Sequence, residues 1–159
     1  MTLNKFLKPV AILALAGVGM QASAGTSVSA AYPETVADAL QDLGYKAAVT
    51  TDSYGDPQIR SASNGVNFTL FFYGCDDDGE NCQDIQFTAA FDMTYEMDLK
   101  SMNTWNRERA MGKAFLDDEM DPVLQHYMIS VDGMSRSVFE ESFEYWTEIL
   151  SDFTDFIDW

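Results

Sequence analysis

The chain has 159 residues, a length that suits one domain of ordinary size rather than two. Hydrophobic residues make up 47% of it and aromatic residues 13%, which is enough for a packed core and excludes a disordered chain. Nine Lys and Arg face 26 Asp and Glu, and the net charge of −17 excludes nucleic acid as a partner, because phosphates would meet a field of their own sign.

The first 24 residues are typical of a secretory signal peptide. Lys5 and Lys8 give a positive start, residues 10–20 form a short apolar stretch, and Ala-Ser-Ala at 22–24 supplies the small side chains that precede a cleavage site. Eleven apolar residues are too few for a membrane anchor, which needs about 20. We therefore predict a bacterial protein that is periplasmic or secreted and has no membrane span after signal removal.

Cleavage is expected after Ala24, and a second small-residue site at 28–30 is the alternative. Loss of the two lysines leaves seven bases against 26 acids, a net charge of −19. Residues 25–32 are mostly small and show no periodic pattern, so we expect a loose mature N-terminus. Residues 33–159 are predicted to form a single domain.

The mature chain predicts an α+β fold in which three helices pack on an antiparallel sheet. A helix begins at Pro33, repeats apolar side chains at helical spacing and ends before Gly44. Asn-Gly at 64–65 is a strong hairpin signal, and residues 83–93 alternate apolar and polar side chains like a strand with one buried face. A middle helix is expected over 100–110, and strands over 46–51, 58–63, 66–73, 83–93, 114–116 and 122–131.

The two cysteines of the chain, Cys75 and Cys82, flank a polar loop between two predicted strands. In an oxidising compartment this arrangement predicts a disulfide at the base of a hairpin. A redox pair or a pair of metal ligands is the alternative. The spacing is not Cys-x-x-Cys and the sequence has no second pair of cysteines, which favours the structural disulfide.

Four of the seven bases of the mature chain cluster around the middle helix. Either they brace this helix by pairing with nearby acids, or they form a cationic notch that binds a carboxylate or a peptide terminus. Trp105, on the same helix, is expected to point into the core. The four bases are Lys100, Arg107, Arg109 and Lys113.

The chain has two acidic loops, at 76–80 and 117–121, and the first of them resembles a fragment of an EF-hand calcium loop. With Gly79 at the sixth position of an EF-hand loop, Gly74 and Ile85 fall where Asp and Glu ligands are required, so the motif fails. We predict no metal site and no cofactor. A different oxygen-rich cation site in one of these loops is the alternative to a solvated acidic loop.

The last predicted helix carries a long aromatic stripe. Ser137 and Glu140 match a capping box, which places its first turn there. The stripe should pack on the sheet, against residues such as Ile85, Phe87 and Phe91. A flank beside the stripe is either further core or a contact for another chain. The stripe comprises Phe139, Phe143, Trp146, Leu150, Phe153 and Ile157, and the flank is formed by Tyr145, Ile149 and Phe156.

Motifs for catalysis are absent from the sequence. It has no Gly-x-Ser-x-Gly elbow, no phosphate-binding glycine-rich loop and no His-Glu-x-x-His. The single histidine, His126, falls in a predicted strand and is interpreted as a structural residue rather than a general base. Paired carboxylates are uninformative, because a chain with 26 acids brings two together by chance. We predict a protein that is not an enzyme and has no catalytic residues.

Five short runs in the chain carry a family resemblance: Gly-Val-Asn-Phe at 65–68, Phe-Phe-Tyr-Gly-Cys at 71–75, Trp-Asn-Arg-Glu-Arg at 105–109, Gly-Lys-Ala-Phe-Leu-Asp at 112–117 and Asp-Pro-Val-Leu at 121–124. These runs resemble the YbjN family, described as bacterial sensory-transduction regulators. The resemblance spans about 33–150, and its specific part runs from the third to the last of them. It implies no catalytic residues.

The resemblance also implies a fold similar to that of the type III secretion chaperones, which have helix, three strands, helix, two strands, helix and often form dimers. The present sequence departs from this order, because four strands are predicted before the middle helix. It also departs by carrying an export signal, which removes it from cytoplasmic partners.

Two classes of function fit these observations. The first is a non-catalytic module of the bacterial envelope, with a binding, chaperone-like or regulatory-accessory role and a protein or peptide partner, a second copy of the chain included. The alternative is an acidic structural protein of the periplasm that binds Ca²⁺ or is adapted to salt, which the net charge of −19 favours.

Overall fold

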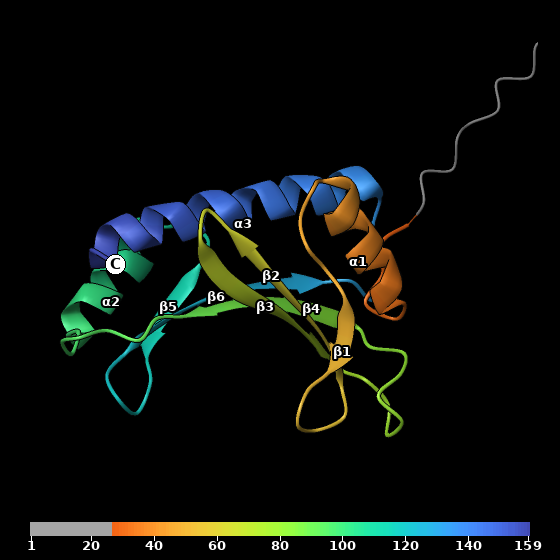
Figure 1. The fold of residues 1–159 in the computed structure, drawn as a ribbon, viewed down its shortest axis with the longest axis horizontal. Coiled ribbons are helices and arrows are strands. Elements are labelled where there is room, and N and C mark those ends of the chain that lie inside the picture. The colour runs from red at the N-terminus through yellow and green to blue at the C-terminus, as the bar shows by residue number, and fades with distance from the viewer. Residues whose placement is uncertain (1–26) are drawn as a thin grey trace, which may run out of the picture.

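Residues 27–159 are described by the computed structural model, and they fold into a six-stranded antiparallel sheet and three helices (Figure 1). The strands lie in the order β1-β2-β3-β4-β6-β5. This arrangement confirms the predicted α+β class. In chain order the elements are α1 (Pro33–Asp42), β1 (Val49–Thr51), β2 (Pro57–Ser63), β3 (Val66–Tyr73), β4 (Asp84–Ala90), α2 (Leu99–Glu108), β5 (Lys113–Leu116), β6 (Pro122–Ile129) and α3 (Arg136–Ile157).

Helix α3 runs the length of the sheet across one of its faces (Figure 1). Helix α1 lies beside one end of α3, and α2 lies at the other end, next to β5. After β4 the chain passes through α2 and forms β5 at the edge of the sheet. It then turns back, and β6 pairs between β4 and β5. Four strands precede α2, as the sequence predicts, although β1 has only three residues.

The hairpin between β2 and β3 sets the register of the sheet. Asn64 and Gly65 have φ angles of 50° and 86°, the left-handed pair that a two-residue turn requires. Ser63 therefore pairs with Val66, and the pairing continues to Gln58 and Phe71. Because side chains alternate along each strand, this register decides which residues face the helices.

The predicted aromatic stripe of α3 is buried against the inner face of the sheet. The ring of Trp146 lies 5.4 Å from that of Phe87, and the ring of Phe153 lies 5.5 Å from that of Phe91. Burial of an aromatic side chain contributes roughly 1.5–3 kcal/mol, so this contact is the main source of stability for α3. All six residues of the stripe are at most 4% exposed.

The start of α3 differs from the predicted capping box. The helix begins at Arg136, and the hydroxyl of Ser135 accepts the backbone N–H of Val138 at 3.3 Å. Glu140 does not reach back to the helix start, because its carboxylate is held by the Arg136 guanidinium at 2.8 Å. The capping box of Ser137 and Glu140 was wrong: a serine two residues earlier caps the helix.

The prediction of a loose N-terminus fails for residues 28–30. Val28 is 1% exposed and Ala30 is fully buried. Val28 and Met134 exchange two backbone hydrogen bonds, of 2.8 and 2.9 Å, and the Ala30 N–H donates to the Ser130 hydroxyl at 3.1 Å. A side chain on Gly133 would lie 3.3 Å from the Val28 carbonyl oxygen, so glycine lets the two segments approach. The segment is packed because it closes the end of the core.

The predicted signal peptide, residues 1–24, lies outside the described residues. Among the helices of residues 27–159, none has the length and apolar character needed to cross a bilayer.

Candidate partner-binding face

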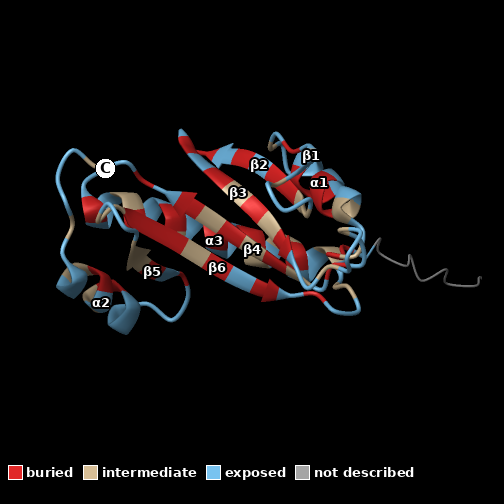
Figure 2. Ribbon diagram, turned by 90° about the horizontal axis from the view of Figure 1, so that it is seen from below, coloured by how far each residue is buried: buried red, intermediate tan, exposed pale blue. Residues whose placement is uncertain are grey.

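One face of the sheet has no helix over it. Figure 2 looks at the sheet from below, and β2, β3, β4 and β6 lie in front with α3 behind them. We call this surface the uncovered face. Its central residues are those that the pleat directs away from α3: Arg60, Asn67, Thr69, Phe71, Tyr73, Asp84, Gln86, Thr88, Lys113, Phe115, Gln125, Tyr127 and Ile129.

Strand register brings these side chains into rows across the sheet. Phe71, Gln86 and Tyr127 form one row, because Phe71 pairs with Gln86 and Gln86 with Tyr127. Thr88 pairs with Gln125 in the next row, and Gln125 pairs in turn with Lys113 of β5. The floor of the uncovered face is therefore a mixture of aromatic rings, amides and hydroxyls, which can both pack and form hydrogen bonds.

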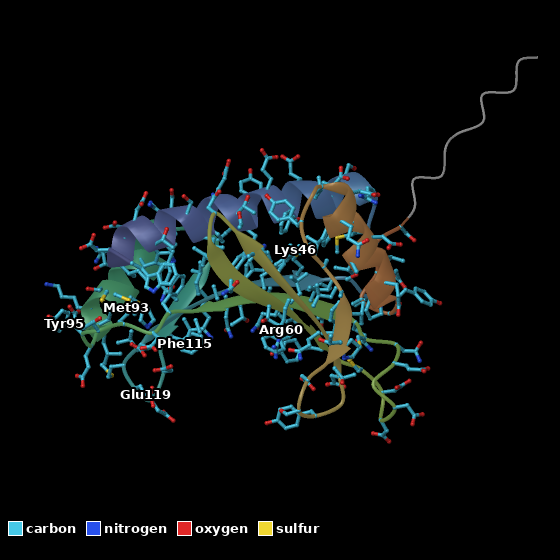
Figure 3. The ribbon with its side chains drawn as sticks, viewed as in Figure 1. Lys46, Arg60, Met93, Tyr95, Phe115 and Glu119 are labelled. Carbon is cyan, nitrogen blue, oxygen red and sulfur yellow. A yellow bond between two sulfur atoms is a disulfide. The ribbon has the colours of Figure 1, made fainter. Side chains whose placement is uncertain are left out.

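The uncovered face is nearly free of carboxylates in a chain of net charge −17. Within residues 27–159, the sheet residues that point to this side include two bases, Arg60 and Lys113, and one acid, Asp84. Arg60 and Phe115 extend below the sheet in Figure 3. Most acids lie on the solvent side of α3 and in the loops 52–56, 76–80 and 117–121, which extend below the sheet at the rim of the uncovered face (Figure 1). A partner that approached the uncovered face would therefore meet a floor with few charges inside an acidic rim.

Aromatic and aliphatic side chains are exposed at one end of this face. Tyr73 is 41% exposed, Tyr127 50% and Ile129 73%. Hydrogen bonding to the Asp84 carboxylate raises the pKa of Tyr127, and burial, with a smaller contribution from Asp52, raises the pKa of Tyr73. Both phenols stay neutral at physiological pH. The Tyr73 hydroxyl can donate a hydrogen bond to a partner, whereas the Tyr127 hydroxyl donates to Asp84.

Cys75 and Cys82 form a disulfide, as predicted. It closes the loop between β3 and β4, at the edge of the uncovered face. In the described part of the chain no cysteine is free.

Three acidic loops close on themselves in one common way. In the loops 52–56, 76–80 and 117–121, the first N–H donates to the fifth carbonyl at 2.8 to 2.9 Å. The carboxylate of the leading aspartate accepts the third and fifth N–H of its own loop. Hydrogen bonds from the Asn81 side chain and the Glu80 N–H lower the pKa of Asp76. Within residues 27–159 no three His, Cys, Asp or Glu side chains are grouped to hold a metal ion.

The family model of YbjN, with the description "Putative bacterial sensory transduction regulator", matches residues 32–159. This chain belongs to the YbjN family. The match covers the whole sheet and all three helices, so the uncovered face is a surface of the YbjN domain itself. No curated protein and no solved structure matches the chain.

The bases of the predicted cationic notch point in different directions in this YbjN domain. Arg107 pairs with Glu108 at 3.3 Å, and Arg109 pairs with Asp152 of α3 at 3.3 Å while its guanidinium lies 5.0 Å from the Trp105 ring. Lys113 lies on the uncovered face, with its ammonium 4.9 Å from the Phe115 ring. The fourth base, Lys100, lies at the start of α2, more than one helical turn before Arg107. Arg107, Arg109 and Lys113 therefore contact acids or aromatic rings rather than sharing one notch.

The predicted flank of α3 is divided between surface and core. Tyr145 is 46% exposed and Phe156 is 37% exposed, although the Phe156 ring lies 5.4 Å from that of Trp105. Ile149 packs on the core, and its terminal methyl carbon would be 2.9 Å from a side chain placed on Gly112. The three residues therefore do not form one continuous apolar surface, and the flank is not the candidate site.

His126 and Trp105 lie where the sequence placed them. His126 is 8% exposed, its ring is 6.2 Å from that of Phe87 on the inner face, and burial lowers its pKa. Trp105 is 1% exposed, and its Nε1–H donates to the Gly112 carbonyl oxygen at 2.7 Å.

The uncovered face was not predicted as a site, although the sequence carries a signal for it. The polar positions of strand 83–93 and the exposed aromatic positions of its neighbours mark a solvated face. The position of α2 could not be inferred from this pattern. The helix packs beside β5 at the end of the sheet and leaves this face open.

Proposed function

We propose that this YbjN protein is an exported, non-catalytic binding module that serves as an accessory component of envelope regulation. The family description supports a regulatory role. The partner is a protein or peptide that binds the uncovered face, in a chaperone-like or signal-relaying interaction.

The observation that carries this proposal is the distribution of charge. A chain of net charge −17 leaves one broad face with a single acid among its outward-pointing strand residues, and that face bears exposed Tyr127 and Ile129. Exposed apolar side chains that adjoin one another mark contact sites more often than scattered ones do. Interfaces are enriched in tyrosine and depleted of acids, which is the composition found here.

Export is part of the proposal. The first 24 residues have the pattern of a signal peptide, and an oxidising compartment would preserve the Cys75–Cys82 disulfide. Packing of Val28 and Ala30 supports cleavage after Ala24, because cleavage at the second site would remove both residues from the end of the core.

Site-specific photo-cross-linking in intact cells tests the proposal. A photoreactive phenylalanine analogue replaces Gln86, at the centre of the uncovered face, and in a matched strain it replaces Glu148, on the solvent side of α3. We expect a discrete cross-linked protein from position 86, recovered from the periplasmic fraction, and none from position 148. Cross-links from position 148 alone, or a protein that stays in the cytoplasm with Met1 intact, would contradict the proposal.

A further inference from the structure

Strand β6 is paired along only half of one side. It pairs with β4 from Ala90 to Asp84 along its whole length, whereas β5 reaches only from Leu116, opposite Pro122, to Lys113, opposite Gln125. Beyond this point, residues 126–129 have no strand on the β5 side. We call this segment the open edge.

The ladder on the β4 side shows which backbone groups point to the open edge. The Pro122 carbonyl accepts the Phe91 N–H at 3.1 Å, and the Ser130 N–H donates to the Gln83 carbonyl at 2.9 Å. In an antiparallel pair these bonds recur at every second residue, so the even-numbered residues of β6 bond to β4. The N–H and C=O groups of Tyr127 and Ile129 therefore point away from β4, into the space that β5 leaves empty.

The chain diverges from the open edge because of Gly112. Its carbonyl oxygen turns back to accept the Trp105 Nε1–H at 2.7 Å, and its φ of 80° is a conformation that favours glycine. Residues 110–112 consequently line one wall of a hollow of about 450 Å³, and Gln86 and Tyr127 line another. The hollow lies directly beside the unpaired backbone.

This edge is short and has Lys113 beside it, but it is otherwise little protected. Natural proteins place lysine, proline or a bulge at such positions, or make the strand very short. The outer edge strand β1 follows this rule with its three residues, Val49–Thr51. The open edge instead presents Tyr127 and Ile129, which are 50% and 73% exposed.

We propose that the open edge binds an extended segment of a partner protein as an added β-strand, a mode in which backbone hydrogen bonds give affinity and alternate side chains give specificity. This inference rests on the proposed function and names the form of the partner. The segment is neutral or basic, because the mature chain, of net charge −19, repels acidic peptides and a second copy of itself. Its apolar residues recur at every second position, so that they lie beside Tyr127 and Ile129.

Amide hydrogen exchange of the oxidised protein, residues 25–159, tests the proposal residue by residue. In the free protein the amides of Tyr127 and Ile129 should exchange fast, and those of His126 and Met128 slowly. The probe is the synthetic peptide acetyl-Lys-Thr-Val-Thr-Val-Thr-Lys-amide. At saturation we expect exchange at Tyr127 and Ile129 to slow at least tenfold, with no change at positions 141, 144 and 148 of α3.

Two controls separate backbone pairing from apolar adhesion. Two N-methylated versions of the peptide are compared, one methylated at both valines and the other at all three threonines. Because only alternate peptide amides face β6, one version should lose binding and the other should keep it. Ile129→Pro removes the backbone N–H of residue 129, which bonds to nothing in the free protein, and this variant should not bind the peptide. Ile129→Thr keeps that N–H and should retain most of the affinity. The peptide controls decide the matter if Ile129→Pro fails to fold.

Slow exchange at Tyr127 in the dilute free protein would overturn the proposal, as would binding by both methylated peptides. Protection that rises with protein concentration without any peptide would identify a second copy as the occupant and would also overturn it. If a partner cross-links at position 86 while exchange at Tyr127 and Ile129 is unchanged, strand addition is wrong and the proposed function stands.

Discussion

Removal of the packed N-terminal segment should weaken the domain measurably, although the sequence gives no sign of it. The two chains to compare are 25–159, the product of cleavage after Ala24, and 31–159, the product of cleavage at the second site. The shorter chain loses the Val28 side chain, Ala30 and three hydrogen bonds to the segment between β6 and α3.

The magnitude follows from these contacts. Burial of a valine contributes roughly 2 kcal/mol and of an alanine about 1 kcal/mol. The three hydrogen bonds add about 1 kcal/mol each. Fixing residues 28–30 costs roughly 1.5 kcal/mol for each of them, so the net loss on truncation is about 1.5 kcal/mol.

Urea unfolding followed by tryptophan fluorescence measures this difference. With a denaturant slope of about 2 kcal/mol per M, the midpoint of the shorter chain should fall by about 0.8 M. In the longer chain, Val28→Ala should reproduce roughly 1 kcal/mol of the loss, and Tyr32→Ala, at a side chain 66% exposed, should change stability by less than about 0.5 kcal/mol. Equal midpoints for the two chains would refute the assignment of residues 28–30 to the core.

Three further changes test the fold. Cys75→Ala should lower the free energy of unfolding by about 2.5 kcal/mol, since the disulfide closes a short loop; an unchanged urea midpoint under non-reducing conditions would count against this. Ile149→Asp should destabilise the domain by about 3 kcal/mol or more, because this side chain packs on the core, whereas Val138→Asp, at a position 53% exposed, should be tolerated; equal effects by circular dichroism would place Ile149 at the surface. Burial lowers the pKa of His126 in the folded state, so protons bind the unfolded chain more readily and the stabilisation is lost as pH falls below about 6.5; the wild-type advantage over His126→Gln should shrink between pH 7.5 and 5.5, and a constant or growing advantage would refute the burial of a neutral ring.

Elements with a strong local pattern could be predicted from the sequence. Strand β3 begins and ends where the Asn-Gly turn and the alternating residues 66–73 place it, because a two-residue turn leaves one register. The stripe of α3 is equally clear, since six large side chains at helical spacing need one common surface to cover them. The disulfide followed from two cysteines and a short loop.

Features that depend on contacts between distant segments could not be predicted. Val28 and Ala30 are buried by a bridge to Met134, and small aperiodic residues carry no signal of such a bridge. Ile149 lies on the same side of α3 as exposed Tyr145, and only the close approach of Gly112 makes it core.

The candidate site was missed for the same reason. Alternation in β4 shows that one face is polar, but whether a helix covers that face is decided by the path of the chain. The open edge begins where the chain turns away from β6 at Gly112, whose carbonyl oxygen accepts the Trp105 Nε1–H and whose φ is 80°. No spacing of residue types records it.

The central claim is that partners bind the uncovered face, and isosteric changes of charge test it most directly. The double variant Gln86→Glu with Gln125→Glu adds two acids at the centre of the uncovered face and changes no side-chain volume appreciably. The matched control, Glu144→Gln with Glu148→Gln, removes two acids from the solvent side of α3.

The measurement is the affinity of the partner recovered by cross-linking for the wild-type protein and both double variants, with unfolding midpoints measured in parallel. The account predicts that the variant of the uncovered face binds at least tenfold more weakly at unchanged stability, while the control binds as the wild type does. Full affinity in the first variant, or a loss confined to the control, would contradict it.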